Sequence, residues 1–232
     1  MKLSIIIPAY NEARTIKEVI KRVRAARVFG LEKEIIVVDD GSNDQTFSLV
    51  RTEPGVTLIY HAINQGKGTA LRAGFKQATG DIVLIQDADL EYDPSNYESL
   101  LTPIVQGLAD VVYGSRFISD RPRRVLFFHH YLANQLITFV SNLFTNFNLS
   151  DVETGYKVFK REVILTILPK LSSPRFGIEV EITARVARAK CRIYEVGISY
   201  AGRTYEEGKK ITWRDGLVAL WHIFYFNLFH RD

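Results

Sequence analysis

The first half of the chain alternates short runs of β-branched apolar residues with segments of helical periodicity. In residues 12–27, for example, Ile16, Val19, Ile20 and Val23 recur on one helical face. Short apolar runs separated by such helices are typical of parallel strands buried on both faces and joined by crossover connections. We expect strands at residues 2–7, 34–38, 56–60, 81–86 and 110–113, and helices at residues 12–27, 44–51, 68–78 and 94–106. The pattern predicts an α/β fold with a doubly wound sheet.

The size and composition of the chain fit one globular domain. It has 232 residues, of which 47% are hydrophobic and 24% charged, and this balance excludes a disordered chain. No linker or internal repeat divides it, so we predict a single domain over residues 1–232. The lone cysteine, Cys191, excludes an intramolecular disulfide and fits a reducing compartment.

Polar clusters follow the predicted strands at the points where the strands end. They are Pro8-Ala9-Tyr10-Asn11-Glu12, Asp39-Asp40, Gln86-Asp87-Ala88-Asp89 and Gly114-Ser115-Arg116. The carboxyl ends of parallel strands meet at one edge of a sheet, where ligands of such folds bind. Each cluster alone is also ordinary turn chemistry, but four together predict a site.

The chemistry of this predicted site points to a divalent cation. The sequence has neither the glycine fingerprint of dinucleotide-binding folds nor a phosphate-binding P-loop, so another device must handle phosphate. Asp87 and Asp89 offer the hard oxygen ligands that Mg²⁺ or Mn²⁺ prefers. Such an ion bridging two phosphates would neutralise a diphosphate leaving group.

Several motifs resemble those of the family 2 inverting glycosyltransferases, which have a GT-A fold. The matching segments are IIIPAYNE (5–12), VVDDGSNDQT (37–46), NQGKGTALRAGF (64–75) and DIVLIQDADLEYDP (81–94). Further segments are similar to the polyprenyl-phosphate sugar transferase branch: VVYGSRF (111–117), DVETGYKVFKREV (151–163), FGIEVEI (176–182) and GRTYEEGKKITWRDG (202–216). The resemblance implies a GT-A-type, Rossmann-like mixed sheet that is mostly parallel. It also divides the domain into a nucleotide-sugar-binding part (1–118) and an acceptor-binding, membrane-facing part (119–232).

The resemblance also implies roles for individual residues. The nucleotide-sugar would be bound by Pro8, Ala9, Tyr10, Glu12, Asp39, Asp40, Lys67, Gln86, Asp87 and Lys209. The metal would be held by Asp87 and Asp89, and the acceptor phosphate by Arg116 and Arg124. The residues closest to the chemistry would be Asp89, Arg116 and Arg203.

Two uncharged segments of the second half suggest contact with a membrane surface. Residues 125–150 contain no Asp, Glu, Lys or Arg, and residues 217–229 are uncharged and aromatic. In the first segment an apolar stripe (Phe128, Leu132, Leu136, Phe139, Leu143, Phe147) lies beside a polar one (His130, Asn134, Thr138, Ser141, Thr145). Such a pattern favours amphipathic helices at the membrane interface, with packing against the core as the alternative. The basic residues Arg121, Arg123 and Arg124 favour an anionic lipid surface. We therefore expect peripheral attachment at the cytoplasmic face of a membrane.

The reaction that the resemblance implies is hexose transfer from a nucleotide-sugar, of the GDP-mannose or UDP-glucose type, to a polyprenyl phosphate such as dolichyl phosphate. A phosphate nucleophile is largely ionised at neutral pH and needs little or no general base. The alternative is a hydroxyl acceptor, which needs a carboxylate base, with Glu179 and Glu181 as candidates. A third interpretation is a non-catalytic membrane-associated scaffold. The net charge of only +4 argues against a nucleic-acid partner, and a homo-oligomer remains open.

Overall fold

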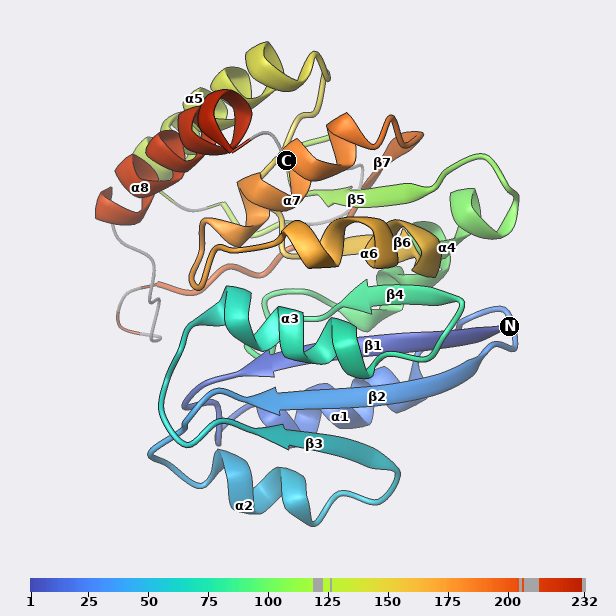
Figure 1. Ribbon diagram of the computed structural model, residues 1–232. Helices are drawn as coiled ribbons and strands as arrows, with labels where there is room; N and C mark the ends of the chain where they lie inside the picture. Colours follow the sequence, from blue (N-terminus) through green and yellow to red (C-terminus); the bar gives the residue numbers. More distant parts are fainter. Residues whose placement is uncertain (119–122, 126, 205, 207–212, 231–232) are drawn as a thin grey trace.

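The computed structural model describes residues 1–118, 123–125, 127–204, 206 and 213–230, with the backbone alone for residues 213–215. Within these residues a seven-stranded sheet has the order β3-β2-β1-β4-β6-β5-β7 (Figure 1). Its strands are β1 (Lys2–Ala9), β2 (Glu32–Asp39), β3 (Val56–Tyr60), β4 (Ile82–Ile85), β5 (Val111–Ser115), β6 (Lys157–Lys160) and β7 (Ile193–Gly197). Only β6 runs against its neighbours, β4 and β5. The predicted mixed, mostly parallel sheet is confirmed.

Helices cover both faces of the sheet. One face packs against α1 (Ile16–Ala25) and α4 (Tyr97–Val105), and the other against α3 (Lys67–Gln77), α6 (Arg161–Ile167) and α7 (Ile178–Arg188). Alternate strand residues supply the two cores, because successive side chains of a strand point to opposite faces. In β1, Ile5 and Ile7 face the α1 side and Ile6 faces the α3 side. The short helix α2 (Thr46–Arg51) contacts β3 at the edge of the sheet.

The predicted elements differ from the observed ones mainly at their ends. Strand β1 continues through Pro8 and Ala9, and α1 begins at Ile16 because residues 13–15 form a turn. The predicted helix 94–106 is a 3-10 turn (Pro94–Asn96) followed by α4. The sequence pattern did not predict β6 or β7, which are short and lie in the second half of the chain.

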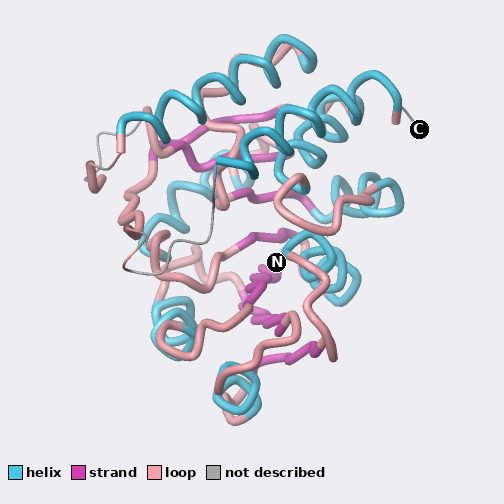
Figure 2. The backbone as a smooth tube through the Cα atoms, turned by 90° about the vertical axis from the view of Figure 1, so that its left-hand side faces the viewer, coloured by secondary structure: helices cyan, strands magenta, loops and turns pink. Residues whose placement is uncertain are grey.

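Two helices, α5 (Phe128–Thr145) and α8 (Trp213–Phe224), lie side by side at the end of the molecule opposite α2 (Figures 1 and 2). A single π-helical turn (Tyr225–Phe229) continues α8. Both helices pack on α7 through a small third core that includes Ile137, Val180 and Ile223. They form an additional layer beyond the helix that covers the sheet.

The orientation of α5 tests one of the two interpretations of its sequence, the packing of the apolar stripe against the core. Its polar stripe faces inward, since Asn134, Thr138 and Ser141 are buried. Its apolar stripe faces outward, with Phe128 69%, Phe139 66% and Leu143 70% exposed. Packing of the apolar stripe against the core is therefore the wrong interpretation, except for Phe147, which is partly buried after the helix ends. None of the helices in the described residues has the length and apolar character needed to cross a bilayer.

The apolar surface of α8 continues that of α5. Large side chains are exposed on α8 and on the turn that follows it: Leu217, Val218, Trp221, Phe224, Tyr225, Leu228 and Phe229. Phe144 of α5 and Phe224 of α8 meet edge to face, with ring centroids 5.1 Å apart. We call the outward faces of α5 and α8 the apolar face.

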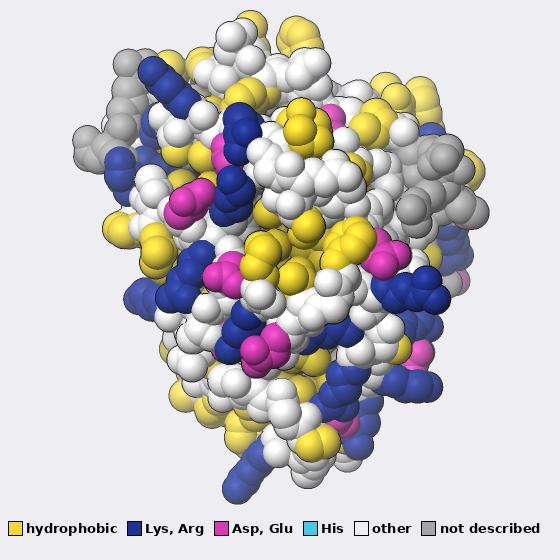
Figure 3. Space-filling view, turned by 90° about the vertical axis from the view of Figure 1, so that its right-hand side faces the viewer, with side chains coloured by type: hydrophobic (Ala, Val, Ile, Leu, Met, Phe, Trp, Pro, Cys, Tyr) yellow, Lys and Arg dark blue, Asp and Glu magenta, His cyan; other side chains and the backbone are white. Residues whose placement is uncertain are grey.

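The edge of the sheet where the strands begin carries charges of both signs. Figure 3 shows Lys and Arg side chains interspersed with Asp and Glu around a hydrophobic patch. Several of these charges are paired: Lys2 with Glu34 at 2.8 Å, and Asp110 with both Lys160 and Arg192 at 2.8 Å. Exposed pairs of this kind contribute little to stability. Positive and negative side chains are both present on this edge.

Close packing of α3 on β1 predicts an unusual response to a glycine substitution. A Cβ atom on Gly74 would lie 2.4 Å from Cγ2 of Ile6, whereas one on Gly216 of α8 would lie 3.8 Å from its nearest neighbour, Cδ1 of Ile137. We expect Gly74→Ala to lower the free energy of unfolding by about 1–3 kcal/mol through overpacking. Gly216→Ala should raise it by up to about 1 kcal/mol through helix propensity. Urea unfolding followed by circular dichroism measures both changes, and a stabilising Gly74→Ala would contradict the packing.

Candidate active site

The carboxyl ends of β1, β2, β4 and β5 lie along one edge of the sheet, as the sequence predicts. All four strands point the same way, because β1 is parallel to β2 and β4 and because β6 is antiparallel to both β4 and β5. Figure 2 faces this edge. The predicted clusters at Glu12, Asp39, Asp87 and Arg116 therefore share one side of the molecule.

The two predicted metal ligands, Asp87 and Asp89, follow β4 and are both partly buried. Oδ1 of Asp87 forms an ion pair with Nζ of Lys67 at 2.8 Å, and Oδ2 of Asp89 forms one with Nη2 of Arg203 at 3.0 Å. The backbone of Gly155 lies against Asp87 so closely that a Cβ atom there would be 2.2 Å from Oδ2. A glycine at position 155 thus lets the loop after α5 pack directly on the carboxylate.

The negative charges around Asp89 indicate whether the site suits a divalent cation. Burial raises the pKa of Asp89 to about 7, with further contributions from the negative charges of Asp87 and Glu91. Carboxylates that repel one another in this way are stabilised by an added positive charge. No group of three or more Asp, Glu, His or Cys side chains in the described part of the chain forms a complete metal site. The residues therefore fit an ion of the Mg²⁺ type, which takes one or two carboxylates and completes its shell with substrate phosphates and water.

Lys67 links the Asp87 carboxylate to a buried ion-pair network. Gly66, with φ of 97°, precedes α3, and Lys67 is the first residue of the helix. The Nζ atom of Lys67 lies 2.8 Å from Oδ1 of Asp87 and 3.0 Å from Oε1 of Glu179. The other oxygen of Glu179 pairs with Nζ of the fully buried Lys157. Burial opposes charge on Lys67 and Glu179, but their partners outweigh it, so the pKa of Lys67 is raised and that of Glu179 lowered.

Arg203 brings the segment after β7 onto the carboxylates. Besides Asp89, its guanidinium contacts Oε1 of Glu91 at 3.2 Å and Oε2 of Glu12 at 3.6 Å. Its backbone N–H also donates to Glu91 at 3.0 Å. One arginine therefore joins the residues that follow β1 to those that follow β4.

The two predicted acceptor residues, Arg116 and Arg124, lie next to the same segment. Arg116 donates to both oxygens of Asp151 at 2.7 Å and to Oδ1 of Asn134 at 3.2 Å. The Tyr200 ring lies 5.3 Å from its guanidinium carbon, and the hydroxyl of Tyr200 donates to Glu91. Arg124 donates from its backbone to the carbonyl of Tyr200 and from Nη1 to that of Gly202. Residues 200–203 thus connect the arginines to the carboxylates.

The neighbouring aspartates that end β2 have different surroundings. Both oxygens of Asp40 are occupied by the loop that precedes α3, including the backbone N–H groups of Gln65 and Gly66 and the ring of His61. Asp39 accepts from the backbone of Ser42 through Oδ1, whereas its buried Oδ2 has no hydrogen-bond partner among the described residues. Of the two carboxylates, Asp39 is therefore the one with an oxygen available to a ligand.

The remaining predicted nucleotide-sugar residues fall into three groups. Pro8, Ala9, Tyr10 and Glu12 lie at the end of β1, and Glu12 contacts Arg203. Gln86 is buried next to Asp87, its Oε1 accepts from the hydroxyls of Tyr97 and Tyr156, and its amide donates to backbone carbonyls. These bonds give Gln86 a structural role, and its contact with the nucleotide-sugar stays a prediction. Lys209 lies outside the described residues, as does Arg121 of the basic cluster.

The two glutamates considered as a general base are both engaged by other side chains. Glu179 holds Lys67 and Lys157. Glu181 is fully buried and accepts from the backbone N–H groups of Ser172 and Ser173. Both carboxylates are thus already paired or hydrogen-bonded within the described part of the structure.

Three acidic residues of the site escaped the sequence analysis: Glu91, Asp151 and Glu153. All three stand in motifs that carry the family resemblance, Glu91 in residues 81–94 and Asp151 and Glu153 in residues 151–163, so their place in these motifs was the available signal. Oε1 of Glu153 is buried, and no residue that the structure describes forms a hydrogen bond with it. Burial, with repulsion from Glu179, raises the pKa of Glu153 to about 7.

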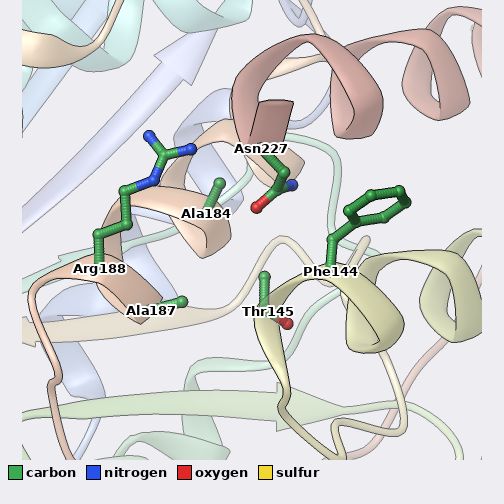
Figure 4. Close-up of a pocket in the computed structure, with 6 residues that line it drawn as sticks. All are labelled: Phe144, Thr145, Ala184, Ala187, Arg188 and Asn227. Carbon is green, nitrogen blue, oxygen red and sulfur yellow. The ribbon is translucent and has the colours of Figure 1, made fainter. Parts of the chain in front are cut away.

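Two surface hollows are separate from the carboxylates that follow β4. One of about 320 Å³ lies between α5, α7 and the C-terminal turn, and Figure 4 shows Phe144, Ala184, Arg188 and Asn227 around it. Arg188 donates there to the carbonyls of Phe226 and His230. The other, of about 600 Å³, lies between α3 and the turn after α6. Neither is lined by an acidic side chain, so neither resembles the cluster at the strand ends.

Solved structures share this fold. Glucosyl-3-phosphoglycerate synthase from Mycobacterium tuberculosis, crystallised with Mn²⁺ and UDP-glucose, superposes with a TM-score of 0.75 at 20% sequence identity. The match covers 99% of this chain and 78% of that one. The α/β sheet and its helices are therefore GT-A-like.

Curated relatives match most of the chain. It is 29% identical over 214 residues to the dolichol-phosphate mannosyltransferase of Pyrococcus furiosus. This alignment covers 90% of this chain but only 59% of the relative. It is 29% identical over 221 residues to the undecaprenyl-phosphate mannosyltransferase of Micrococcus luteus, covering 90% of this chain and 87% of the relative. Glycosyltransferase AglD of Haloferax volcanii is 28% identical over 215 residues, which are 86% of this chain and 33% of the relative.

The family model for glycosyl transferase family 2 matches residues 4–168, which is more than half of the chain. This range begins in β1 and includes the strand ends that carry Asp39, Asp87, Asp89 and Arg116. The chain belongs to glycosyl transferase family 2.

Proposed function

We propose that the protein transfers a hexose from a nucleotide-sugar to a polyprenyl phosphate, with inversion at the anomeric carbon. One observation carries the proposal: residues 200–203 hold the carboxylates after β4 and the arginines after β5 in a single site. Acids suit a metal-bound diphosphate and arginines suit a second phosphate. The names of two relatives, both polyprenyl-phosphate mannosyltransferases, support this acceptor class.

The donor would bind across the ends of β1, β2 and β4. Asp39 would contact the nucleoside through its unpartnered oxygen, beside Pro8, Ala9 and Tyr10. Asp87 and Asp89 would hold Mg²⁺ or Mn²⁺, which neutralises charge on the departing diphosphate. Crystals of the mycobacterial synthase contain Mn²⁺ or Mg²⁺ together with UDP, which supports this choice of ion. Lys67 and Arg203 already lie on the two aspartates and would move to the diphosphate oxygens.

The acceptor phosphate would bind at Arg116 and Arg124. Asp151 fixes the Arg116 guanidinium through two hydrogen bonds, so its direction is set before the ligand arrives. The chain's main task is to hold two anionic reactants in line and to offset their repulsion. A phosphate acceptor needs no base, and the engagement of Glu179 and Glu181 by other groups favours it over the hydroxyl alternative.

The apolar face would lie on the membrane from which the lipid acceptor comes. Val125, Phe127 and Phe128, next to Arg123 and Arg124, extend this exposed surface towards Arg116. Phe117 and Tyr131 stack edge to face between the two regions, with centroids 5.3 Å apart. Arginines beside exposed aromatic and aliphatic groups suit an anionic lipid surface. We propose peripheral attachment at the cytoplasmic face, which the single cysteine also favours.

The carboxylate pair can be tested with Asp89→Asn. We expect hexose transfer in Mn²⁺ to fall by at least about 100-fold, because one of two metal ligands is lost. Asp93→Asn is the matched control, since Asp93 only caps the 3-10 turn before α4. Radiolabelled transfer to polyprenyl phosphate, with Mn²⁺ or with EDTA, measures both variants. Activity of the wild type that survives EDTA undiminished would contradict the metal assignment.

The acceptor arginines can be tested with Arg124→Gln. We expect the KM for polyprenyl phosphate to rise about tenfold, because a charged hydrogen bond to phosphate is lost, while hydrolysis of the donor stays within about twofold. Arg27→Gln, an exposed arginine that follows α1, should change neither quantity. An equal effect of Arg124→Gln on donor hydrolysis would place this arginine in the donor site instead.

Membrane contact can be tested with the double substitution Leu136→Gln and Phe139→Gln. Both side chains are exposed on α5, at 54% and 66%, so folding should be unaffected. Sedimentation with anionic phospholipid vesicles should fall at least about tenfold, because each apolar group contributes roughly 1.5–3 kcal/mol when buried in lipid. The control is Leu108→Gln with Leu165→Gln, which are exposed but lie away from the apolar face. Equal vesicle binding by both double variants would refute the assignment of this face.

A further inference from the structure

Glu153 is an ionisable side chain of the site to which the proposed reaction gives no task. It lies in the loop between α5 and β6, and its carboxylate makes no hydrogen bond in the described part of the structure. Its Oε1 atom is buried. Leaving a charged group without partners in the interior is costly, so an unpaired carboxylate oxygen here calls for an explanation.

The backbone on both sides of Glu153 is firmly held. Val152 is buried and its N–H donates to Oγ1 of Thr138. Thr154 is buried and its hydroxyl donates to the carbonyl of Gly114. The ammonium of Lys157 bonds the carbonyls of Val152 and Thr154. Glu153 is thus fixed in place without using its own side chain.

The loop that carries Glu153 runs from the acceptor end of the site to the donor end. Asp151 holds Arg116, and Gly155 lies against Asp87. Four residue steps span at most about 14 Å, so Glu153 is within about 7 Å of each end, measured along the backbone. The charges of Arg116, Asp151, Lys157 and Glu179 all act on its carboxyl. In the proposed reaction the transferred hexose must occupy this interval, between the diphosphate and the acceptor phosphate.

We propose that the Glu153 carboxylate accepts hydrogen bonds from hydroxyl groups of the transferred hexose and is a specificity-determining residue for that sugar. This inference rests on the proposed function. Sugar hydroxyls are the donors that a buried acceptor without partners lacks. A site that relies on such bonds strongly rejects a sugar whose hydroxyl points elsewhere, because the buried carboxylate is then left unpaired. The raised pKa of Glu153 agrees with its burial and with repulsion from Glu179.

Calorimetric titration in Mn²⁺ tests the proposal by comparing a nucleotide with its sugar derivative: UDP with UDP-glucose and UDP-galactose, and GDP with GDP-mannose. For Glu153→Gln and Glu153→Ala we expect the Kd of the free nucleotide to stay within about twofold. The Kd of the preferred nucleotide-sugar should rise about 10- to 100-fold, and discrimination between the glucose and galactose epimers should shrink. The melting temperature should not fall, because no protein hydrogen bond is removed.

Glu195→Gln is the matched control. Glu195 is a carboxylate beside the same loop, but its oxygens accept from the backbone of Ser150 and Asp151. This variant should lose stability without changing the difference in affinity between nucleotide and nucleotide-sugar.

Three results would overturn the proposal. They are an equal loss of affinity for the free nucleotide, unchanged affinity for every nucleotide-sugar, and a wild type that binds nucleotide and nucleotide-sugar alike. A fall confined to kcat, with binding intact and a pH profile that loses its acidic limb, would instead make Glu153 the base for a hydroxyl acceptor. Failure of the wild type to use polyprenyl phosphate would refute the proposed function, while the donor-binding comparison would still test Glu153.

Discussion

The site at the strand ends is held together by ion pairs between closely spaced carboxylates and three positively charged side chains of the chain. Asp87 and Asp89 follow β4, and Glu179 lies in the first turn of α7. These carboxylates pair with Lys67, Lys157 and Arg203. Removing one member of such a cluster would leave an uncompensated charge in a poorly solvated place. The cations come from α3, from β6 and from the segment after β7. Charge pairing therefore joins distant parts of the sequence at the one edge where parallel strands end.

The same pairing prepares the site for anionic ligands. Lys67 and Arg203 are both less than one fifth exposed and are oriented by the carboxylates before any ligand is present. In the proposed reaction they pass from carboxylate to diphosphate oxygens, so the donor meets cations whose position is already fixed. Arg116 is held differently, by a bidentate bond to the buried Asp151 that leaves its direction set while the acceptor binds. The donor side thus exchanges partners and the acceptor side stays fixed.

Sequence patterns predicted the sheet better than the site. Buried parallel strands are continuous apolar runs, so β1 to β5 could be recognised from composition alone, whereas β6 and β7 carry Lys157, Lys160 and Glu195 and lack that signal. The polar clusters could be placed on one edge because parallel strands require it. The sequence could not predict which side-chain atoms of each cluster are left to bind a ligand. Asp40 accepts hydrogen bonds from the loop before α3, and Oε1 of Gln86 accepts from the hydroxyls of two tyrosines. Such assignments depend on contacts between residues far apart in the sequence.

Helix α5 shows why amphipathicity alone did not fix its orientation. The polar face of α5 points inward because it forms hydrogen bonds with the segments beneath it. Asn134 accepts from Arg116, and Oγ1 of Thr138 accepts from the backbone N–H of Val152. The side chain of Asn142 both donates to and accepts from the backbone of Leu149. These bonds hold the loop that positions Arg116 and carries Glu153. The face left outside is the uncharged apolar one. One helix therefore supports Arg116, a proposed acceptor residue, on its inner side and presents an apolar surface on its outer side. In the proposed function, the amphipathic pattern couples the position of the acceptor phosphate to the surface through which a lipid acceptor would arrive.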